Sequence, residues 1–330
     1  LYSATNQNID IVFRQGTRLI FCFILMLIIS LIDINKLKNM SPYIYILCLI
    51  MLMITLFWGH DVKGAKRWIV IMGFSFQVSE IIKFFVPMTL AWYLSLSDDK
   101  DIDIKKLIIC FAIILAPIFF IIKQPDLGTS LIILLCGLIT IFLGGIKKKQ
   151  MIILFGLFSI AIPIMWKFIL LPYQKKRIMT LFDPTLDPLG SGYHIMQSKI
   201  AVGSGGFLGK GFLNGTQSQL EFLPERGTDF IFAVFAEEFG FVGVLILFLV
   251  YLIIIARCLQ ITFKAKSYFA KIFSGSISSI LILLVVTNVS MAVGLLPVVG
   301  VTLPLISLGG SSLLSIFVAF GIMFSINRRA

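Results

Sequence analysis

The stretch Leu223-Pro224-Glu225-Arg226-Gly227-Thr228-Asp229-Phe230 ends a long polar connection and opens an apolar run that continues to Ala256. A run of about 20 apolar residues can cross the ~30 Å hydrocarbon core of a bilayer as a helix. An ionisable side chain where such a run begins is costly to keep near lipid and is therefore a candidate functional group. The stretch predicts a membrane helix with a candidate carboxylate, Asp229, at its start.

The composition extends this prediction to the whole chain. Of its 330 residues, 58% are hydrophobic and only 13% are charged, and the mean hydropathy is +1.02. A soluble domain usually has about a quarter of its residues charged. We therefore expect an all-α, polytopic integral membrane protein that forms one membrane domain over residues 1–330. The apolar runs predict about nine transmembrane helices, at roughly 18–33, 42–59, 77–96, 106–122, 127–145, 151–171, 229–256, 271–296 and 307–326.

Lysine and arginine are more abundant in every second short connection. The richer set marks the cytoplasmic side and contains Lys36, Lys38, Lys100, Lys105, Lys106, Lys147, Lys148, Lys149, Arg257, Lys264, Lys266, Arg328 and Arg329. The poorer set contains Lys63, Lys66, Arg67 and Lys123. The pattern predicts a cytoplasmic C-terminus, an extracytoplasmic N-terminus and a large extracytoplasmic loop at 172–228. We interpret the net charge of +12 through this topology and expect no nucleic-acid partner.

The N-terminal segment is unusual for an exported end. The sequence begins with Leu1, and residues 1–17 are polar, too short to span and without the basic and apolar regions of a signal peptide. We expect that a preceding span is missing from this sequence. The alternative is a short tail that the first helix carries across the membrane.

Few residues are available for disulfides or a metal site. None of the five cysteines forms a C-x-x-C pair, which gives disulfide and zinc interpretations little support. His194 is one of only two histidines, so no His-rich metal site is expected.

The 172–228 loop carries too many aromatic and aliphatic residues for disorder. It contains a possible amphipathic helix at Ile195–Val202, followed by a glycine-rich run at Gly203–Gly211. The run is not a Walker A loop, because Ser204 would stand at the first glycine and Gly211 at the Ser/Thr position. Two interpretations stay open: a flexible turn, or a nest of backbone N–H groups that binds an anion such as a lipid pyrophosphate.

Several motifs together resemble the SEDS family over nearly the whole chain, and they are closer to its RodA branch than to its division branch, FtsW. The motifs are Gly64–Trp68, Ser79–Lys83, Gln124–Thr129, Tyr193–Ala201, Gly215–Arg226, Thr228–Ala233, Gly294–Gly300 and Leu305–Ser311. The chain departs from the family pattern in having nine predicted spans where ten are usual. It also has Gly227 where His is usual, Val78 where Pro is usual and Leu308 where Tyr is common.

The resemblance implies a peptidoglycan glycosyltransferase of the bacterial cytoplasmic membrane that polymerises lipid II during cell elongation and rod-shape maintenance. By motif, Asp229 matches the essential aspartate of the family, which we expect to act as the general base. The alternative is that Thr228 or Asp229 caps a helix beginning at Phe230. Glu225 is a second catalytic candidate, and its alternative role is an ion pair with Arg226. The resemblance further implies a class B penicillin-binding protein as partner and, as cofactor, at most a divalent cation on the pyrophosphate.

Other charged residues are candidates for substrate binding. Glu80 and Lys83 are three residues apart in the third span and share a helix face, so they form either a structural ion pair or a polar wall of the substrate cavity. The cations Lys66, Arg67, Lys210 and Arg226 are candidates for contacting the pyrophosphate. Anionic lipid headgroups are their alternative ligands.

Three other functions stay open at this point. A transporter or flippase of the lipid-linked precursor could use Glu80, Lys83 and Asp126 as its path. The chain could also be a non-catalytic scaffold for a cell-wall enzyme, or could serve in division as FtsW does. A polymerase needs lateral access for lipid tails, so we expect a groove between helices beneath the 172–228 loop.

Overall fold

The structure is a computed structural model that describes residues 1–5, 7–62, 65–71, 74–97, 102–188, 190–220, 222–223 and 225–328. A few residues used above lie outside this part of the chain, namely Lys63, Gly64, Lys100, Glu221, Pro224 and Arg329.

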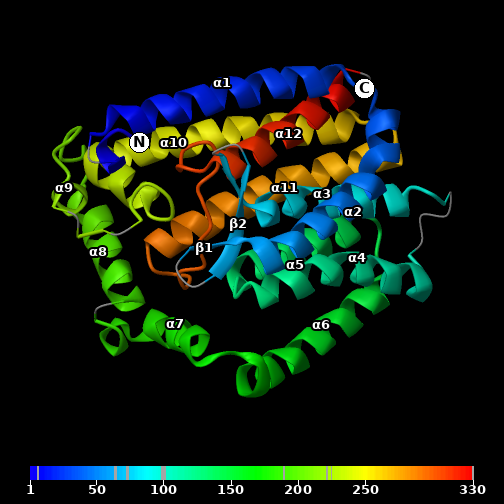
Figure 1. Cartoon of the computed structure of the whole chain (residues 1–330), viewed down its shortest axis with the longest axis horizontal. Coiled ribbons are helices and arrows are strands. Elements are labelled where there is room, and N and C mark those ends of the chain that lie inside the picture. Colours follow the sequence, from blue (N-terminus) through cyan, green and yellow to red (C-terminus); the bar gives the residue numbers. More distant parts are fainter. Residues whose placement is uncertain are drawn as a thin grey trace. The chain divides into compact units, whose positions relative to one another are not determined.

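Long helices dominate the described residues (Figure 1). They are α1 (Ile9–Leu31), α2 (Ile34–Trp58), α3 (Val78–Leu94), α4 (Ile104–Lys123), α5 (Leu127–Leu143), α6 (Lys148–Ile164), α10 (Ile231–Lys264), α11 (Tyr268–Ala292) and α12 (Gly310–Asn327). Seven helical segments in this part of the chain are long and apolar enough to cross a membrane, and α3 and α5 are shorter, with 17 residues each. The expectation of a polytopic helical membrane protein is confirmed.

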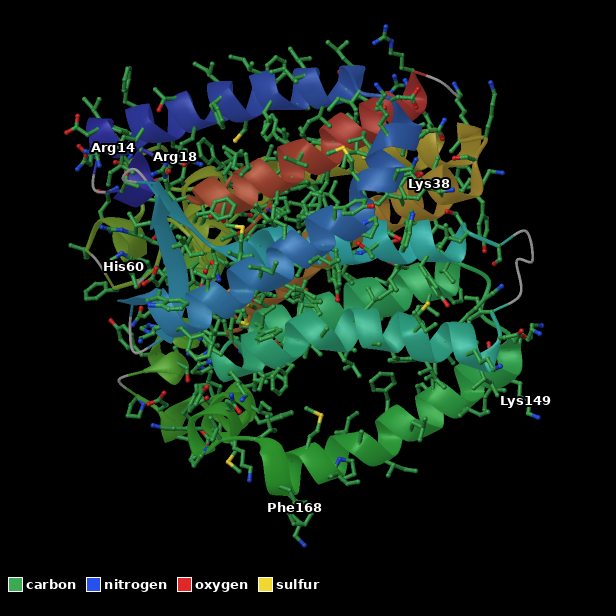
Figure 2. The ribbon with its side chains drawn as sticks, turned by 45° about the vertical axis from the view of Figure 1, so that its right-hand side comes forward. Arg14, Arg18, Lys38, His60, Lys149 and Phe168 are labelled. Carbon is green, nitrogen blue, oxygen red and sulfur yellow. The ribbon has the colours of Figure 1, made fainter. Side chains whose placement is uncertain are left out.

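The first helix begins earlier than the sequence suggested. The expected boundary near residue 18 was wrong, since α1 starts at Ile9 and includes Arg14 and Arg18 (Figure 2). The side-chain oxygen of Asn8 accepts hydrogen bonds from the backbone N–H groups of Asp10 (2.9 Å) and Ile11 (3.3 Å). Such bonds satisfy donors that have no partner within the first turn of a helix. A short 3-10 helix, η1 (Ser3–Thr5), precedes this cap.

A small antiparallel sheet between α2 and α3 was not predicted. Its strands are β1 (His60–Val62), β2 (Ala65–Ile71) and β3 (Phe74–Phe76), in the order β1-β2-β3. Trp68 pairs with His60, and Ile69 pairs with Phe76. The sheet matters for function because β2 carries the candidate cations Lys66 and Arg67.

Residues 172–228 contain α7 (Pro172–Phe182), the 3-10 turn η3 (Pro184–Leu186), α8 (Ser191–Ser204) and α9 (Thr216–Gln219). The helix expected at Ile195–Val202 is the central part of α8. The chain from α6 through α7 to α8 follows an open arc, drawn green in Figure 1. The π-helical turn η2 (Met165–Ile169) joins α6 to this segment, and Phe168 projects from it away from the ribbon (Figure 2).

Asp187 joins α7 to α8. Its carboxylate accepts hydrogen bonds from Lys176 Nζ (2.8 Å), the Ser191 backbone N–H (2.8 Å) and the Ser191 hydroxyl (3.0 Å). The hydrogen bond from Lys176, followed by the one from the Ser191 backbone, lowers the pKa of Asp187 below its ordinary value. The segment is therefore a folded structure with its own polar contacts.

The chain forms two compact units, each with its own packing. Unit 1 comprises Leu1–Val12, Ile146–Tyr251 and Leu284–Leu308, and unit 2 comprises Phe13–Gly145, Leu252–Leu283 and Gly309–Ala330. In unit 2, α3 packs against α2, α4, α5 and α12. The Tyr45 hydroxyl of α2 donates to the Ile113 carbonyl of α4 (2.8 Å), and a Cβ on Gly137 of α5 would lie 2.5 Å from Ile114. Small residues and interhelical hydrogen bonds of this kind are how helices associate within lipid.

Candidate functional site

Asp229 lies in a tight turn immediately before α10, in unit 1. The turn begins at Glu225, which has a positive φ of 54°. The Glu225 carbonyl accepts hydrogen bonds from the backbone N–H groups of Thr228 (3.1 Å) and Phe230 (3.3 Å). The Thr228 hydroxyl lies 3.1 Å from the Glu225 carboxylate. Backbone conformations that are rare for a residue with a side chain cluster at functional sites, so this turn is a good candidate for one.

The segment from Asn288 to Leu308 holds the main chain of this turn. Three consecutive carbonyls of the turn each accept a hydrogen bond from it: Gly227 from the Leu308 N–H (2.8 Å), Thr228 from the Ser307 hydroxyl (2.7 Å) and Asp229 from the Asn288 side-chain amide (3.0 Å). Asn288 is fully buried and Ser307 nearly so. The turn is therefore fixed at every residue from 227 to 229.

Gly300 lies close to Asp229, and α8 lies close to the next residue, Phe230. Gly300 has a positive φ of 73°, and a Cβ placed on it would lie 3.7 Å from the Oδ2 atom of Asp229. The ring of His194 on α8 lies 6.4 Å from the ring of Phe230, measured between centroids. Asp229 is half-buried and Glu225 is exposed. The helix α10 begins at Ile231, one residue later than the capping alternative assumed.

Two of the departures from the family pattern contact each other. A Cβ on Gly227 would lie 2.8 Å from the Cδ1 atom of Leu308. The Leu308 side chain therefore occupies space into which a larger residue at position 227 would extend. Sequence patterns do not predict this contact, because the two residues lie about 80 positions apart along the chain.

The glycine-rich run docks on a break in α10. Gly240 has φ 63° and ψ −165°, which interrupts the helix. The N–H groups of Lys210 and Gly211 donate to the carbonyls of Glu237 and Glu238, at 3.0 Å each. In the opposite direction, the N–H groups of Phe241 and Val242 donate to the carbonyls of Gly206 (3.0 Å) and Phe207 (3.1 Å).

These hydrogen bonds argue against an open anion nest at residues 209–211 and against a flexible turn. The N–H groups of Gly209, Lys210 and Gly211 all donate to protein carbonyls, so they do not form a nest that is open to an anion. The run is not a flexible turn either, since it supplies partners for the backbone groups that a broken helix leaves unsatisfied.

Lys210 forms an ion pair that the sequence did not predict. Its Nζ atom lies 2.8 Å from Oε1 of Glu237, which is fully buried in α10. The same Glu237 oxygen accepts hydrogen bonds from the Thr216 hydroxyl (3.1 Å) and the Gln217 backbone N–H (3.0 Å). The next residue, Glu238, is also buried, and it accepts a hydrogen bond from the Ser3 hydroxyl. The sequence signal for these buried carboxylates is the pair of adjacent glutamates within an apolar run.

Glu80 and Lys83 form an ion pair on α3 of unit 2. Lys83 Nζ lies 2.6 Å from Glu80 Oε2, and the two side chains are 3% and 14% exposed. The i,i+3 spacing on one helix face brings them together, as expected. The two charges are largely buried, and each compensates the other.

Arg67 and Lys66 are successive residues of β2 and differ in their surroundings. Arg67 donates to the carbonyls of Gln124 (3.0 Å) and Pro125 (2.6 Å) at the turn between α4 and α5. Its guanidinium also lies 3.8 Å from Asp126. Lys66 is exposed, and its Nζ lies 3.5 Å from the Phe57 carbonyl. Arg67 therefore stabilises unit 2, whereas Lys66 is accessible to a ligand.

The predicted site residues fall into both units. Unit 1 holds Asp229, Glu225, Arg226 and Lys210, and unit 2 holds Lys66, Arg67, Glu80 and Lys83. The turn brings Glu225, Arg226 and Asp229 together, and Lys210 instead pairs with Glu237. Within the described ranges, no group of three or more His, Cys, Asp or Glu residues could hold a metal ion. All five cysteines are buried and free.

Comparison with known proteins gives consistent matches along the chain. The family model FtsW/RodA/SpoVE, described as "Cell cycle protein", matches residues 2–330. The chain is 43% identical over 327 residues to the peptidoglycan glycosyltransferase MrdB of Escherichia coli (strain K12), covering 99% of this chain and 88% of that protein. It is 37% identical over 315 residues to MrdB of Helicobacter pylori (strain ATCC 700392 / 26695), covering 94% and 81%.

Solved structures agree with these relatives. A chain from a peptidoglycan synthase complex that coordinates polymerization and crosslinking has a TM-score of 0.82 and 30% identity, covering 97% of this chain and 90% of that one. The rod shape determining protein RodA of Thermus thermophilus has a TM-score of 0.74 and 26% identity, covering 99% and 90%. On these matches, the chain belongs to the FtsW/RodA/SpoVE family.

Proposed function

We propose that this protein is a peptidoglycan glycosyltransferase that polymerises lipid II during cell elongation, with Asp229 as the general base. The observation that carries the proposal is the placement of the half-buried Asp229, in a turn whose three consecutive carbonyls accept hydrogen bonds from Leu308, Ser307 and Asn288. The relatives named peptidoglycan glycosyltransferase cover nearly all of the chain and so include this turn.

Growth of the glycan chain requires a base that acts on the acceptor sugar and a leaving group on the donor sugar. The 4-hydroxyl of the acceptor sugar attacks the anomeric carbon of the donor, the new glycosidic bond forms, and undecaprenyl pyrophosphate leaves. The α-linked donor becomes a β-linked unit, so the displacement inverts the anomeric carbon. The hydroxyl proton passes to the Asp229 carboxylate. A carboxylate base activates the nucleophile in the same way in inverting glycosidases, and such help is typically worth ~10²–10⁴-fold in rate.

The pyrophosphate needs cations, and four side chains are candidates. Arg226 is buried in the same turn as Asp229, and we favour it because it is nearest to the base along the chain. Lys210 is less suited, because the Glu237 carboxylate already neutralises it. Lys66 is the accessible candidate in unit 2. Any divalent cation would be coordinated mainly by pyrophosphate oxygens, since hard cations prefer oxygen ligands.

The reaction also requires a particular side of the membrane and a partner. The loop charges support a cytoplasmic C-terminus and predict that residues 172–228, with Asp229, lie outside the cytoplasmic membrane. Glycan strands must then be crosslinked by a second enzyme. A class B penicillin-binding protein is the proposed partner, and the similar chain from a peptidoglycan synthase complex supports this proposal.

The test is the purified Asp229→Asn variant with labelled lipid II. Asparagine keeps the size and capping ability of aspartate but cannot accept the proton. We expect glycan synthesis to fall at least ~100-fold while the folded yield stays unchanged. The matched control is Asp10→Asn, an equivalent change at an exposed position at the start of α1. Near-normal synthesis by a well-folded Asp229→Asn protein would leave only the capping role for this residue.

The same assay separates the alternative functions. Glycan product identifies a polymerase, movement of lipid II across vesicles without product identifies a flippase, and neither result identifies a scaffold. Complementation then separates elongation from division. Restoration of rod shape in cells that lack their elongation enzyme supports the proposal, and restoration of septation alone supports a division role.

A further inference from the structure

The buried side chains that hold the Asp229 turn have no role in the scheme above. Asn288 lies near the end of α11, and Ser307 lies in the connection that precedes α12. We propose that Asn288 is a positioning residue that sets the location of the Asp229 carboxylate, with Ser307 as a second support. This inference rests on the proposed role of Asp229 as general base.

Asn288 joins two segments through one amide group. Its Nδ2 atom donates to the Asp229 carbonyl (3.0 Å) and to the Val301 carbonyl (2.7 Å). Both acceptors are carbonyl oxygens, so the group that faces them must be the NH₂ end of the amide, which has two hydrogens to donate. Asn288 is 0% exposed, the bond to Val301 is buried and the bond to Asp229 is partly buried. The side chain therefore ties the Asp229 main chain to the segment at residue 301.

The hydrogen bonds of Asn288 also restrict the position of the Asp229 carboxylate. The neighbour of Val301 is Gly300, whose Cβ position lies 3.7 Å from Asp229 Oδ2. An aspartate carboxylate is only two rotatable bonds away from its main chain. Fixing the Asp229 main chain beside Gly300 therefore limits the positions that its carboxylate can take. A displacement of about 1 Å in a reacting group can lower a rate by ~100-fold.

Ser307 provides the same kind of support one residue earlier. Its hydroxyl donates to the Thr228 carbonyl (2.7 Å) and accepts a hydrogen bond from the Leu303 N–H (2.8 Å). The hydroxyl thus bridges the turn and the segment at 301–308, in parallel with Asn288. Loss of either side chain leaves a partly buried carbonyl of the turn without its side-chain donor.

The experiment must separate positioning from a general structural role. The test variants are Asn288→Ala, Asn288→Ser, which keeps one donor, and Ser307→Ala. The matched control is Ser198→Ala, because Ser198 is also fully buried in unit 1 and its hydroxyl donates to a backbone carbonyl, that of Ala292 (2.6 Å). That carbonyl lies outside the Asp229 turn. For each purified protein, kcat and KM are measured with labelled lipid II, and Tm is measured in detergent.

We expect Asn288→Ala to lower kcat about 10- to 100-fold with KM changed less than about twofold, because the carboxylate moves while substrate contacts stay. Asn288→Ser should give an intermediate kcat, and Ser307→Ala a smaller loss. Ser198→Ala should lower Tm by a similar amount and keep kcat near that of the unchanged protein.

Other results would overturn the inference. A folded Asn288→Ala protein with normal kcat, or with a raised KM and unchanged kcat, contradicts positioning. So does a loss of kcat in Ser198→Ala that equals the loss in Asn288→Ala. If Asn288→Ala does not fold, normal kcat in both Asn288→Ser and Ser307→Ala is the overturning result.

Asp229→Asn is assayed in parallel, so that the two hypotheses fail separately. Full activity in Asp229→Asn rejects the base assignment and, with it, the positioning inference. An inactive Asp229→Asn protein beside fully active Asn288 and Ser307 variants rejects the positioning inference alone.

Discussion

At the scale of single residues, two opposing effects decide how the Glu80–Lys83 pair influences stability. The two side chains attract each other at 2.6 Å, but burying both charges has a desolvation penalty. Removing one partner leaves the other charge buried and uncompensated, which typically destabilises a protein by ~3–5 kcal/mol. Removing both avoids that penalty.

We therefore predict that Glu80→Ala and Lys83→Ala each lower the thermal stability more than the double variant does. A double-mutant cycle on Tm and on glycan synthesis measures the coupling. The control cycle uses Lys176 and Asp187. Their N–O distance is similar, at 2.8 Å, but the lysine side chain is 54% exposed. Its coupling should stay below about 1 kcal/mol. Additive losses at Glu80 and Lys83 would show that their pairing contributes nothing.

These residues also show what local spacing can and cannot reveal. Glu80 and Lys83 lie on the same helix face by spacing alone, so their pairing was predictable. Glu237 pairs with Lys210, which is 27 positions away in the sequence. Asn288 donates to the Asp229 carbonyl, which is 59 positions away. Contacts between residues this far apart in the sequence depend on tertiary packing, which helical periodicity does not predict.

At the scale of secondary-structure elements, the break in α10 is the feature that a hydropathy pattern cannot reveal. The apolar run continues through Gly240, so the sequence predicted one uninterrupted helix. The backbone at Gly240 (φ 63°, ψ −165°) is accessible essentially to glycine only. A Cβ at this position would also lie 2.2 Å from the Gly209 nitrogen.

We predict that Gly240→Ala lowers the free energy of unfolding by about 2 kcal/mol or more. The matched control is Gly203→Ala, because Gly203 lies in α8 and a Cβ there meets nothing within 4 Å. That change should leave stability unchanged or raise it by up to ~1 kcal/mol. Thermal unfolding in detergent measures both. Equal stability of the two variants would show that the docking of residues 206–211 on α10 is dispensable.

The small sheet between α2 and α3 was missed for a different reason. Its outer strands have only three residues each, too few for an alternating pattern to stand out. The long helices were predicted because each presents a whole membrane thickness of apolar residues. Boundaries such as Ile9 depended on a single capping side chain, Asn8, within a polar segment.

At the scale of the whole molecule, the proposed reaction requires residues 172–228 and the α5–α6 connection to face opposite sides of the membrane. Cysteine labelling tests this in a background in which the five buried native cysteines are replaced. Ser204→Cys and Lys149→Cys are suitable probes because both positions are exposed, and Lys149 is marked in Figure 2.

We predict that a membrane-impermeant thiol reagent added from outside labels Ser204→Cys and leaves Lys149→Cys unlabelled. Lys149→Cys should react once the membrane is permeabilised, which controls for its accessibility. The reverse pattern would place Asp229 on the cytoplasmic side, where no cell wall is built, and the polymerase proposal would have to be abandoned.

The docking of the glycine-rich run on α10 also bears on how the chain is made. Backbone polar groups without hydrogen-bond partners have a high free-energy cost in lipid. The break at Gly240 therefore opposes insertion of α10 into the membrane unless its backbone groups have partners. Residues 206–211 precede Gly240 in the chain and therefore leave the ribosome first. The partners for the Glu237, Glu238, Phe241 and Val242 backbone groups are thus already synthesised when the break emerges. Reversing the order of these two segments, as a circular permutation would, leaves the finished contacts the same but removes that protection during biogenesis.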